Sequence, residues 1–127
     1  MSLGVRPDVK FDTSKEGLHT LMKPYQAALM EYIWKINEKE RTGIISREAH
    51  EYLHDTGKDE LKMSRASVII FLDEMVEDGV LEYETETGKG GHHRVYFPAM
   101  NLKQFESYVS KVIMDKLKEV FAASRKR

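Results

Sequence analysis

A helical pattern of apolar residues lies in the middle of the chain. Four of these residues recur at the i, i+3, i+4, i+7 spacing that lines one face of an α-helix: Val68, Phe71, Leu72 and Met75. Ser64 can satisfy free N–H groups in a first helical turn, and Gly79 can adopt the left-handed conformation that closes a helix. The pattern therefore predicts a helix between these two residues.

Strand-like segments follow this helix directly. The runs 80–85 and 94–97 are rich in β-branched and aromatic residues, which is typical of strands. Residues 87–92 between them are rich in glycine, and we predict a hairpin tip there that is longer than a two-residue turn. A helix followed by such a hairpin, with helices upstream, is the element order of a winged helix-turn-helix domain.

Two further helices and a short strand are predicted upstream. Pro24 suits the first turn of a helix whose apolar stripe continues to Ile36. The apolar pair Ile44–Ile45 suits a small first strand. Ser46 is predicted to cap a second helix that ends near Gly57.

A last amphipathic helix is predicted after residue 98. Eight apolar residues recur there mostly at spacings of three and four: Leu102, Phe105, Val109, Val112, Ile113, Leu117, Val120 and Phe121. Such a helix of roughly 20 residues is about 30 Å long. A small domain cannot cover the whole stripe, so we expect these residues to form a dimer interface with a second copy of the chain.

These elements define the fold class as α+β, mostly α, with one winged helix-turn-helix domain and an added C-terminal dimerisation helix. We expect a flexible arm over residues 1–22, the domain over residues 23–98, and the dimerisation helix with a basic tail over residues 99–127. A chain of 127 residues is long enough for one core plus one appended element.

Composition narrows the chemistry and the location. The chain has no cysteine, which excludes disulfides, thiolate zinc sites and cysteine nucleophiles. No apolar run approaches the roughly 20 residues that span a bilayer, and the N-terminus does not have the pattern of a signal peptide. We therefore expect a cytoplasmic protein without a membrane partner.

The charge of the chain is unevenly distributed around a net value of −1. Residues 44–79 hold four basic and nine acidic side chains, whereas residues 99–127 hold seven basic and three acidic ones. The distribution of charge is therefore more informative about binding partners than the net charge is, because an acidic segment and a basic tail favour different partners.

Four segments carry a resemblance to a known family. They are LMEYIWK at 29–35, MSRASV at 63–68, EDGVL at 77–81 and RVYFP at 94–98. From about Pro24 to Phe121 the chain resembles the winged-helix repressors of the penicillinase repressor family. The resemblance implies a homodimer that binds a palindromic operator in double-stranded DNA, with residues 64–78 as the recognition helix and the trailing helix as the dimerisation element.

Ten residues are candidates for DNA contact: Arg47, Ser64, Arg65, Ser67, Ile69, Ile70, Lys89, His92, His93 and Arg94. The guanidinium of Arg65 can bind phosphate or guanine. Ile69 and Ile70 either pack against neighbouring elements or contact thymine methyl groups or a partner. Lys89 lies in the predicted hairpin tip and Arg94 beside it, where cations can approach phosphates.

Two histidine motifs are candidate metal sites. His92 and His93 are adjacent, so on a strand they point to opposite faces and cannot easily share one metal ion. His50-Glu51-x-x-His54 matches the helix of zinc metalloproteases, in which both histidines bind zinc and the glutamate is the general base. No third ligand is easily placed, and such short motifs often occur by chance. We therefore expect no enzyme, no metal and no cofactor.

Three functions remain in order of preference. The first is a dimeric DNA-binding transcriptional regulator of the repressor type, with an unknown effector. The second is a winged helix that binds a protein through Ile69, Ile70 and the acidic segment. The third is a zinc-dependent hydrolase that uses His50 and His54.

Overall fold

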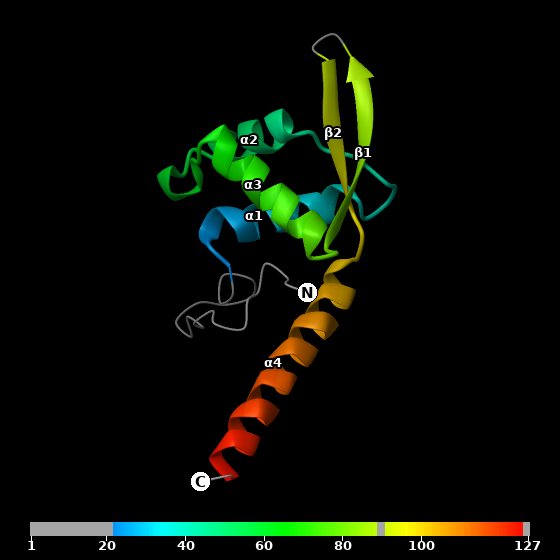
Figure 1. The fold of residues 1–127 in the computed structure, drawn as a ribbon. Coiled ribbons are helices and arrows are strands. Elements are labelled where there is room, and N and C mark those ends of the chain that lie inside the picture. Colours follow the sequence, from blue (N-terminus) through cyan, green and yellow to red (C-terminus); the bar gives the residue numbers. More distant parts are fainter. Residues whose placement is uncertain (1–21, 89–90, 126–127) are drawn as a thin grey trace.

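The computed structural model describes residues 22–88 and 91–125. Within these ranges the protein is α+β and mostly helical, as predicted, with helices packed beside a two-stranded antiparallel sheet (Figure 1). The arrangement is compatible with a winged helix. In chain order the elements are α1 (Pro24–Ile36), α2 (Ser46–Asp55), the 3₁₀-helix η2 (Asp59–Leu61), α3 (Arg65–Glu77), β1 (Leu81–Gly88), β2 (Gly91–Pro98) and α4 (Leu102–Arg125).

The predicted ends of α3 are confirmed. The Ser67 N–H donates to Oγ of Ser64, 3.1 Å away, so Ser64 is the cap. At the other end Gly79 has φ +80°, and the N–H of Val80 donates to the Met75 carbonyl at 2.9 Å. This closure, in which a glycine in the left-handed region follows the helix, gives the Met75 carbonyl a donor.

The predicted cap of α2 is wrong. Ser46 lies inside the helix, and Ile45 precedes it as the N-cap residue without a side-chain acceptor. Instead, Glu48 accepts a hydrogen bond from the Ile45 N–H at 3.0 Å. A glutamate in the first turn also favours the helix N-terminus through its negative charge.

The hairpin differs from its predicted form in length. The strands pair from Leu81 opposite Pro98 to Gly88 opposite Gly91, so they include most of the predicted six-residue tip. Residues 89–90 lie outside the described part of the chain. The predicted first strand is reduced to one bridge, in which Ile44 and Tyr96 exchange hydrogen bonds of 3.0 and 2.8 Å. Ile44 therefore lies along β2, on the edge away from β1.

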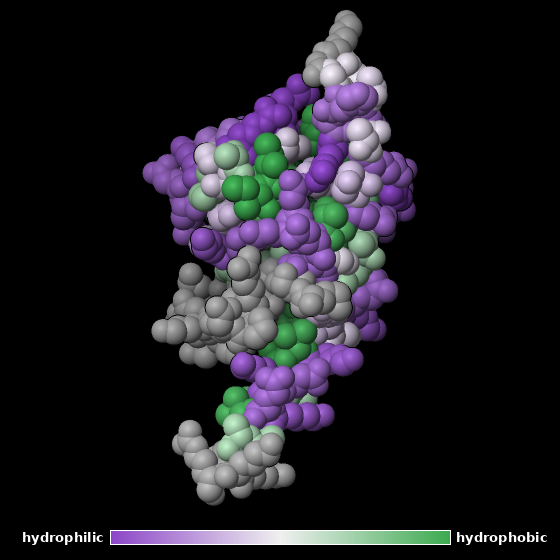
Figure 2. Space-filling model, viewed as in Figure 1, coloured by the Kyte–Doolittle hydropathy of each residue, from purple (hydrophilic) through white to green (hydrophobic). Residues whose placement is uncertain are grey.

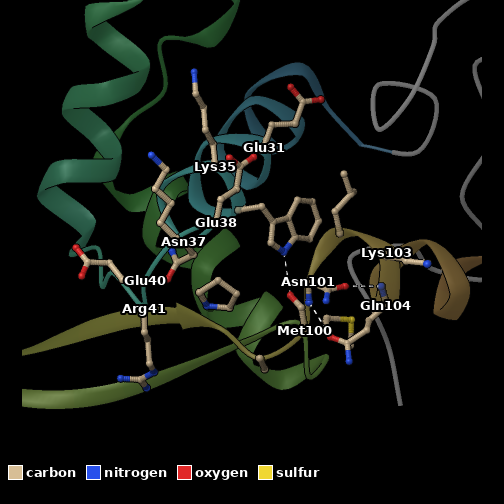
Figure 3. Close-up of a pocket in the computed structure, with 15 residues that line it drawn as sticks. Glu31, Lys35, Asn37, Glu38, Glu40, Arg41, Met100, Asn101, Lys103 and Gln104 are labelled. Atoms are coloured by element: carbon tan, nitrogen blue, oxygen red, sulfur yellow. Dashed lines mark hydrogen bonds between the residues drawn. The ribbon is translucent and has the colours of Figure 1, made fainter.

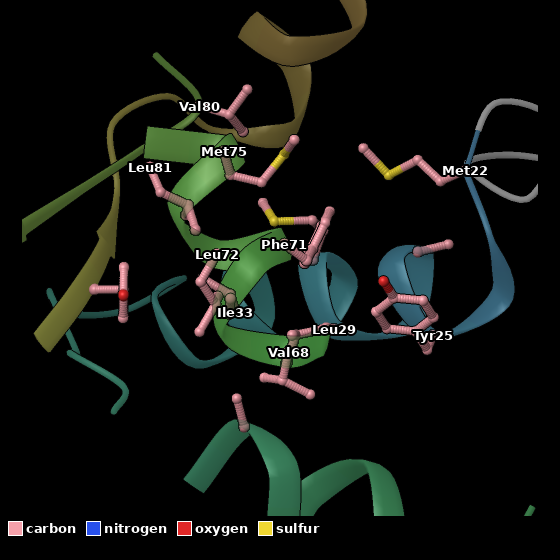
Figure 4. Close-up of a cluster of buried hydrophobic side chains, with 14 of the residues drawn as sticks. Met22, Tyr25, Leu29, Ile33, Val68, Phe71, Leu72, Met75, Val80 and Leu81 are labelled. Atoms are coloured by element: carbon pink, nitrogen blue, oxygen red, sulfur yellow. The ribbon is translucent and has the colours of Figure 1, made fainter. Parts of the chain in front are cut away.

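The core forms where α3 lies between α1 and the base of the hairpin (Figure 4). All four predicted residues of α3 are buried, and they meet Leu29 and Ile33 of α1. Val80 and Leu81 complete this cluster from the start of β1. Because the helix has a period of 3.6 residues, burial of this face determines which side chains of α3 face outward.

The first turns of α4 are attached to the domain. Asn101 caps the helix reciprocally with Gln104, through two hydrogen bonds of 2.8 Å. Trp34 donates from Nε1 to the Met100 carbonyl at 2.9 Å, and its ring lies 5.3 Å from that of Phe105. Beyond this joint α4 projects from the domain, away from the hairpin tip (Figure 1). Within the described ranges, no helix combines the length and apolar character required to cross a membrane.

Gly43 provides a test of how closely the segment before the bridge packs on β2. A Cβ at this position would lie 2.8 Å from Cζ of Phe97 and in conflict with Val95 Cγ1. Gly43→Ala should therefore lower the free energy of unfolding by about 1–3 kcal/mol in urea denaturation, the usual cost of overpacking. Gly88→Ala is the control, because its Cβ would meet only His93 Cε1 at 3.4 Å. Equal losses for the two variants would contradict the packing described here.

Candidate functional site

The outer face of α3 carries exposed apolar side chains. Ile69 is 37% exposed and Ile70 is 59% exposed, so they do not pack in the core of the described protein. Ala66 and Glu77 are exposed on the same helix. Figure 2 shows hydrophobic side chains over α3 framed by hydrophilic ones. Of the alternatives for the isoleucines, contact with a DNA groove or with a protein partner therefore remains.

The start of α3 combines a cap with an exposed arginine. Ser64 and Ser67 are engaged with each other, since the Ser64 hydroxyl lies 3.0 Å from Ser67 Oγ and also accepts the Ser67 N–H. Arg65 is exposed and reaches Ser46 Oγ at 3.4 Å, at the start of α2. Arg47 lies one turn from Glu51, with 3.9 Å between Nε and Oε1. Within the described residues, Arg65 is thus the cation at this end of α3 that has no acidic partner.

A polar cluster joins α3 to the hairpin. Arg94 Nη1 lies 3.1 Å from Asp73 Oδ1, and the Tyr96 hydroxyl donates to the same oxygen at 2.6 Å. The guanidinium of Arg94 lies over the ring of Tyr83, 4.2 Å from its centroid. Burial of the Tyr96 phenol, and then its hydrogen bond to Asp73, raise the pKa of Tyr96 above its ordinary value. We call these four residues the Asp73 cluster.

The Asp73 cluster was not predicted as a unit. Arg94 was predicted to contact phosphate, but in the free protein its side chain binds Asp73. Strand alternation does place Arg94 and Tyr96 on one face of β2. No local signal shows that this face meets α3 at Asp73, which is 21 positions away from Arg94 in sequence.

The opposite face of the hairpin is acidic. Glu82 and Glu84 are exposed on β1, and Glu86 follows them on the same face by strand alternation. Arg41 pairs with the first two at 3.4 and 3.3 Å, and its guanidinium lies 3.5 Å from the centroid of the Phe97 ring. Acidic side chains repel phosphates, so a DNA backbone would approach the α3 side of the hairpin instead.

The histidines of the hairpin lie on different faces. His92 opposes Thr87, with 3.1 Å between the ring Nδ1 and the hydroxyl, whereas His93 opposes Glu86. Lys89, which is also a predicted phosphate contact, lies outside the described residues. The hairpin therefore presents His92 on the same face as Arg94, toward α3.

The His-Glu-x-x-His motif lies on the surface of α2. The rings of His50 and His54 are 4.3 Å apart between centroids, and His54 Nε2 lies 3.2 Å from the Met63 carbonyl oxygen. Glu51 is paired with Arg47. In residues 22–88 and 91–125, no group of three His, Cys, Asp or Glu residues is arranged to hold a metal ion.

The predicted apolar stripe of α4 has two parts. Phe105 and Val109 are buried in their own domain and are therefore not available to a second copy. Val112 and Ile113 are half-buried against the same core. The remaining residues of the stripe are 40–60% exposed: Leu102, Leu117, Val120 and Phe121. Met114, which was not predicted, is 53% exposed beside them.

A groove of about 830 Å³ lies between the end of α1, residues 37–41 and the start of α4 (Figure 3). Trp34 and Met100 are among the residues that line it, and the hydrogen bond at the α4 joint links these two. The lining also includes charges of both signs, such as Glu31, Lys35 and Lys103. No motif in the sequence indicated this groove, because it forms from segments far apart in the chain.

Comparison of the chain with protein-family models, with curated proteins and with solved structures yields no match. Function is therefore inferred from the geometry of this chain.

The short bond between Tyr96 and Asp73 allows a stability test. Tyr96→Phe removes a hydrogen bond to a charged acceptor and should lower the free energy of unfolding by about 1–2 kcal/mol. The folded state holds the phenol proton more tightly than the unfolded state does. The contribution is therefore present below a pH of about 10, the pKa of an unfolded tyrosine, and is lost as the pH rises above it.

The measurement is urea denaturation of wild type and Tyr96→Phe at neutral pH and at a pH above the tyrosine range. Tyr83→Phe is the control, because Tyr83 is 40% exposed and contacts Arg94 through its ring. We expect its effect to stay within about 0.5 kcal/mol. A Tyr96→Phe difference that grows with pH would contradict the assignment.

Proposed function

We propose that this protein is a winged helix-turn-helix DNA-binding transcriptional regulator of the repressor type, which binds a palindromic operator as a homodimer. One observation carries the proposal: α3 exposes one face and is joined through Asp73 and Arg94 to a hairpin beside that face. A helix of this kind fits the major groove, and a flanking hairpin fits the adjacent backbone.

The side chains of the exposed face suit this role in different ways. Recognition helices usually contact base edges with their N-terminal residues, and Arg65 is exposed at that end. Its guanidinium can bind a phosphate or the O6 and N7 atoms of guanine. Ile69 and Ile70 lie one turn further along, where apolar groups can contact thymine methyl groups. The operator is therefore expected to contain thymines opposite these positions.

The second candidate function is a protein-interaction module. It is favoured by the same exposed isoleucines, which are followed on α3 by Asp73 and Glu77. An apolar patch with an acidic border is typical of a protein-binding surface. The two functions differ in one property, because only DNA binding depends strongly on salt through release of counterions from phosphates.

DNA binding can be tested by selection from a random duplex library, followed by fluorescence anisotropy with the recovered site. Contacts from Arg65, Lys89 and Arg94 of both subunits imply a log–log salt slope of roughly −5. Arg65→Ala should reduce that slope by about 1.8 for a dimer. Loss of a phosphate contact weakens all sequences alike, whereas loss of a guanine contact relaxes the preference at a G·C position. Ile69→Ala with Ile70→Ala should instead alter the preference at A·T positions.

Lys103→Ala is the matched control, because it removes one positive charge at the start of α4. Its salt slope should equal that of wild type. If no motif is recovered and no duplex binds even at roughly 50 mM salt, the DNA-binding function is excluded in favour of the protein-interaction module.

Dimerisation is supported by the outer half of α4. Met114, Leu117, Val120 and Phe121 are each at least 44% exposed on a helix of 24 residues, about 36 Å long. Exposed apolar side chains at helical spacing are covered most simply by the same face of a second copy, which an isologous two-fold interface provides.

A pair of substitutions tests this interface without disturbing the joint at Trp34. Leu117→Glu with Phe121→Glu should convert the dimer to a folded monomer, because two buried carboxylates per chain cannot be accommodated. Ala122→Glu introduces the same side chain outside this stripe, about 100° around the helix from Phe121 and about 140° from Leu117, and should leave the dimer intact. Light scattering gives the mass and circular dichroism confirms folding. A wild-type protein that is monomeric at micromolar concentration would disprove the dimer.

A further inference from the structure

The side chain of Arg94 faces α3 from the hairpin and forms an ion pair with Asp73 of that helix. We propose that Asp73 is an inhibitory residue for DNA binding: it neutralises Arg94 in the free protein and on duplexes of unmatched sequence, and a phosphate of a matched site must displace it. This inference rests on the proposed DNA-binding function and names a residue that limits binding to arbitrary sequences.

The geometry allows Arg94 to be released. The side chains of Arg94 and Asp73 are 46% and 39% exposed, so water screens their attraction and the pair is weak. A phosphate competes well for the same guanidinium, because it presents several charged oxygens. The Asp73 carboxylate can therefore lose Arg94 to a phosphate that lies close enough.

The remaining contacts keep both groups in place after the exchange. Tyr96 is 3% exposed and still donates to Asp73 Oδ1, so the carboxylate keeps a hydrogen bond. The ring of Tyr83 lies beneath the Arg94 guanidinium and keeps it on the α3 side of the hairpin. The carboxylate and the phosphate thus compete for a guanidinium whose position changes little.

The exchange should depend on sequence because it requires a close approach of the backbone. When α3 matches the groove, the hairpin beside it reaches the adjacent phosphates. When α3 does not match, the complex is held loosely by charge, and Arg94 remains paired with Asp73. The Arg94–Asp73 pair then adds no net charge to binding of unmatched DNA.

Two other acidic groups must be separated from this effect. Glu77 lies on α3 one turn beyond Asp73 and is exposed. Glu84 lies on the other face of the hairpin, paired with Arg41. Either charge repels DNA in general, but Asp73 alone of these three binds Arg94 in the described structure.

The test compares binding to a mixed-sequence duplex and to the selected site by fluorescence anisotropy. Asp73→Asn keeps the shape of the side chain and an oxygen that can accept from Tyr96. It should tighten binding to the mixed-sequence duplex about tenfold at roughly 50 mM salt and steepen the log–log slope by about 1.8 for a dimer. On the selected site the gain should be at least as large, because wild type must break the Arg94–Asp73 pair there before Arg94 can contact a phosphate.

Three variants make the test specific. Glu77→Gln removes the same charge from the same helix and should give a much smaller gain, because Arg94 stays paired. Arg94→Gln leaves the Asp73 charge unneutralised, so it should weaken binding to the mixed-sequence duplex slightly and binding to the selected site more, since the contact of Arg94 with a phosphate is also lost there. In the double variant with Asp73→Asn, the gain on the mixed-sequence duplex should disappear. Thermal unfolding of each variant confirms that it is folded.

The outcomes separate this inference from the proposed function. Equal gains for Asp73→Asn and Glu77→Gln would overturn the inference, since general repulsion would then explain both. Weaker binding of Asp73→Asn would also overturn it, because Asp73 would then be orienting Arg94 for DNA. If wild type and Asp73→Asn bind all duplexes equally, this inference alone fails. If neither binds any duplex, the DNA-binding function fails with it.

Discussion

Burial of one face of α3 is the constraint from which the candidate surface follows. Val68 and Leu72 are fully buried, and Phe71 is 2% exposed. Because successive residues of a helix are rotated by about 100°, these positions direct Ile69 and Ile70 outward. The proposed recognition surface is therefore the face of α3 opposite the buried one. A rotation of the helix about its axis would disrupt the core and the recognition surface together.

Local signals were sufficient for the helical part of the fold. The apolar period, the cap at Ser64 and the closing glycine Gly79 predicted α3, and the structure confirms all three. The errors lie where partners distant in sequence decide the outcome. In the described chain, Ile44 pairs with Tyr96 in a single bridge instead of a strand. The hairpin strands stay paired as far as Gly88 and Gly91, beyond the predicted end of the first strand. Neither partner is visible in the local pattern.

The candidate site shows the same division. Residue type alone indicated that Arg94 carries charge toward a ligand, but its pairing with Asp73 depends on how the hairpin meets α3. The spacing of apolar residues likewise predicted one continuous apolar stripe on α4. It did not show which residues of the stripe pack on the domain and which lie beyond it. Phe105 lies in the core and Phe121 is 60% exposed, although both belong to the same stripe. Tertiary packing, which no spacing encodes, separates the two.

The joint between Trp34 and the start of α4 has a mechanical consequence. Because Phe105 packs on the Trp34 ring and the indole N–H holds the Met100 carbonyl, the helix cannot pivot freely at residue 101. A rod of about 36 Å fixed at one end acts as a lever. In a dimer held by its outer half, any rotation of one rod against the other would reorient both domains and change the distance between their two α3 helices.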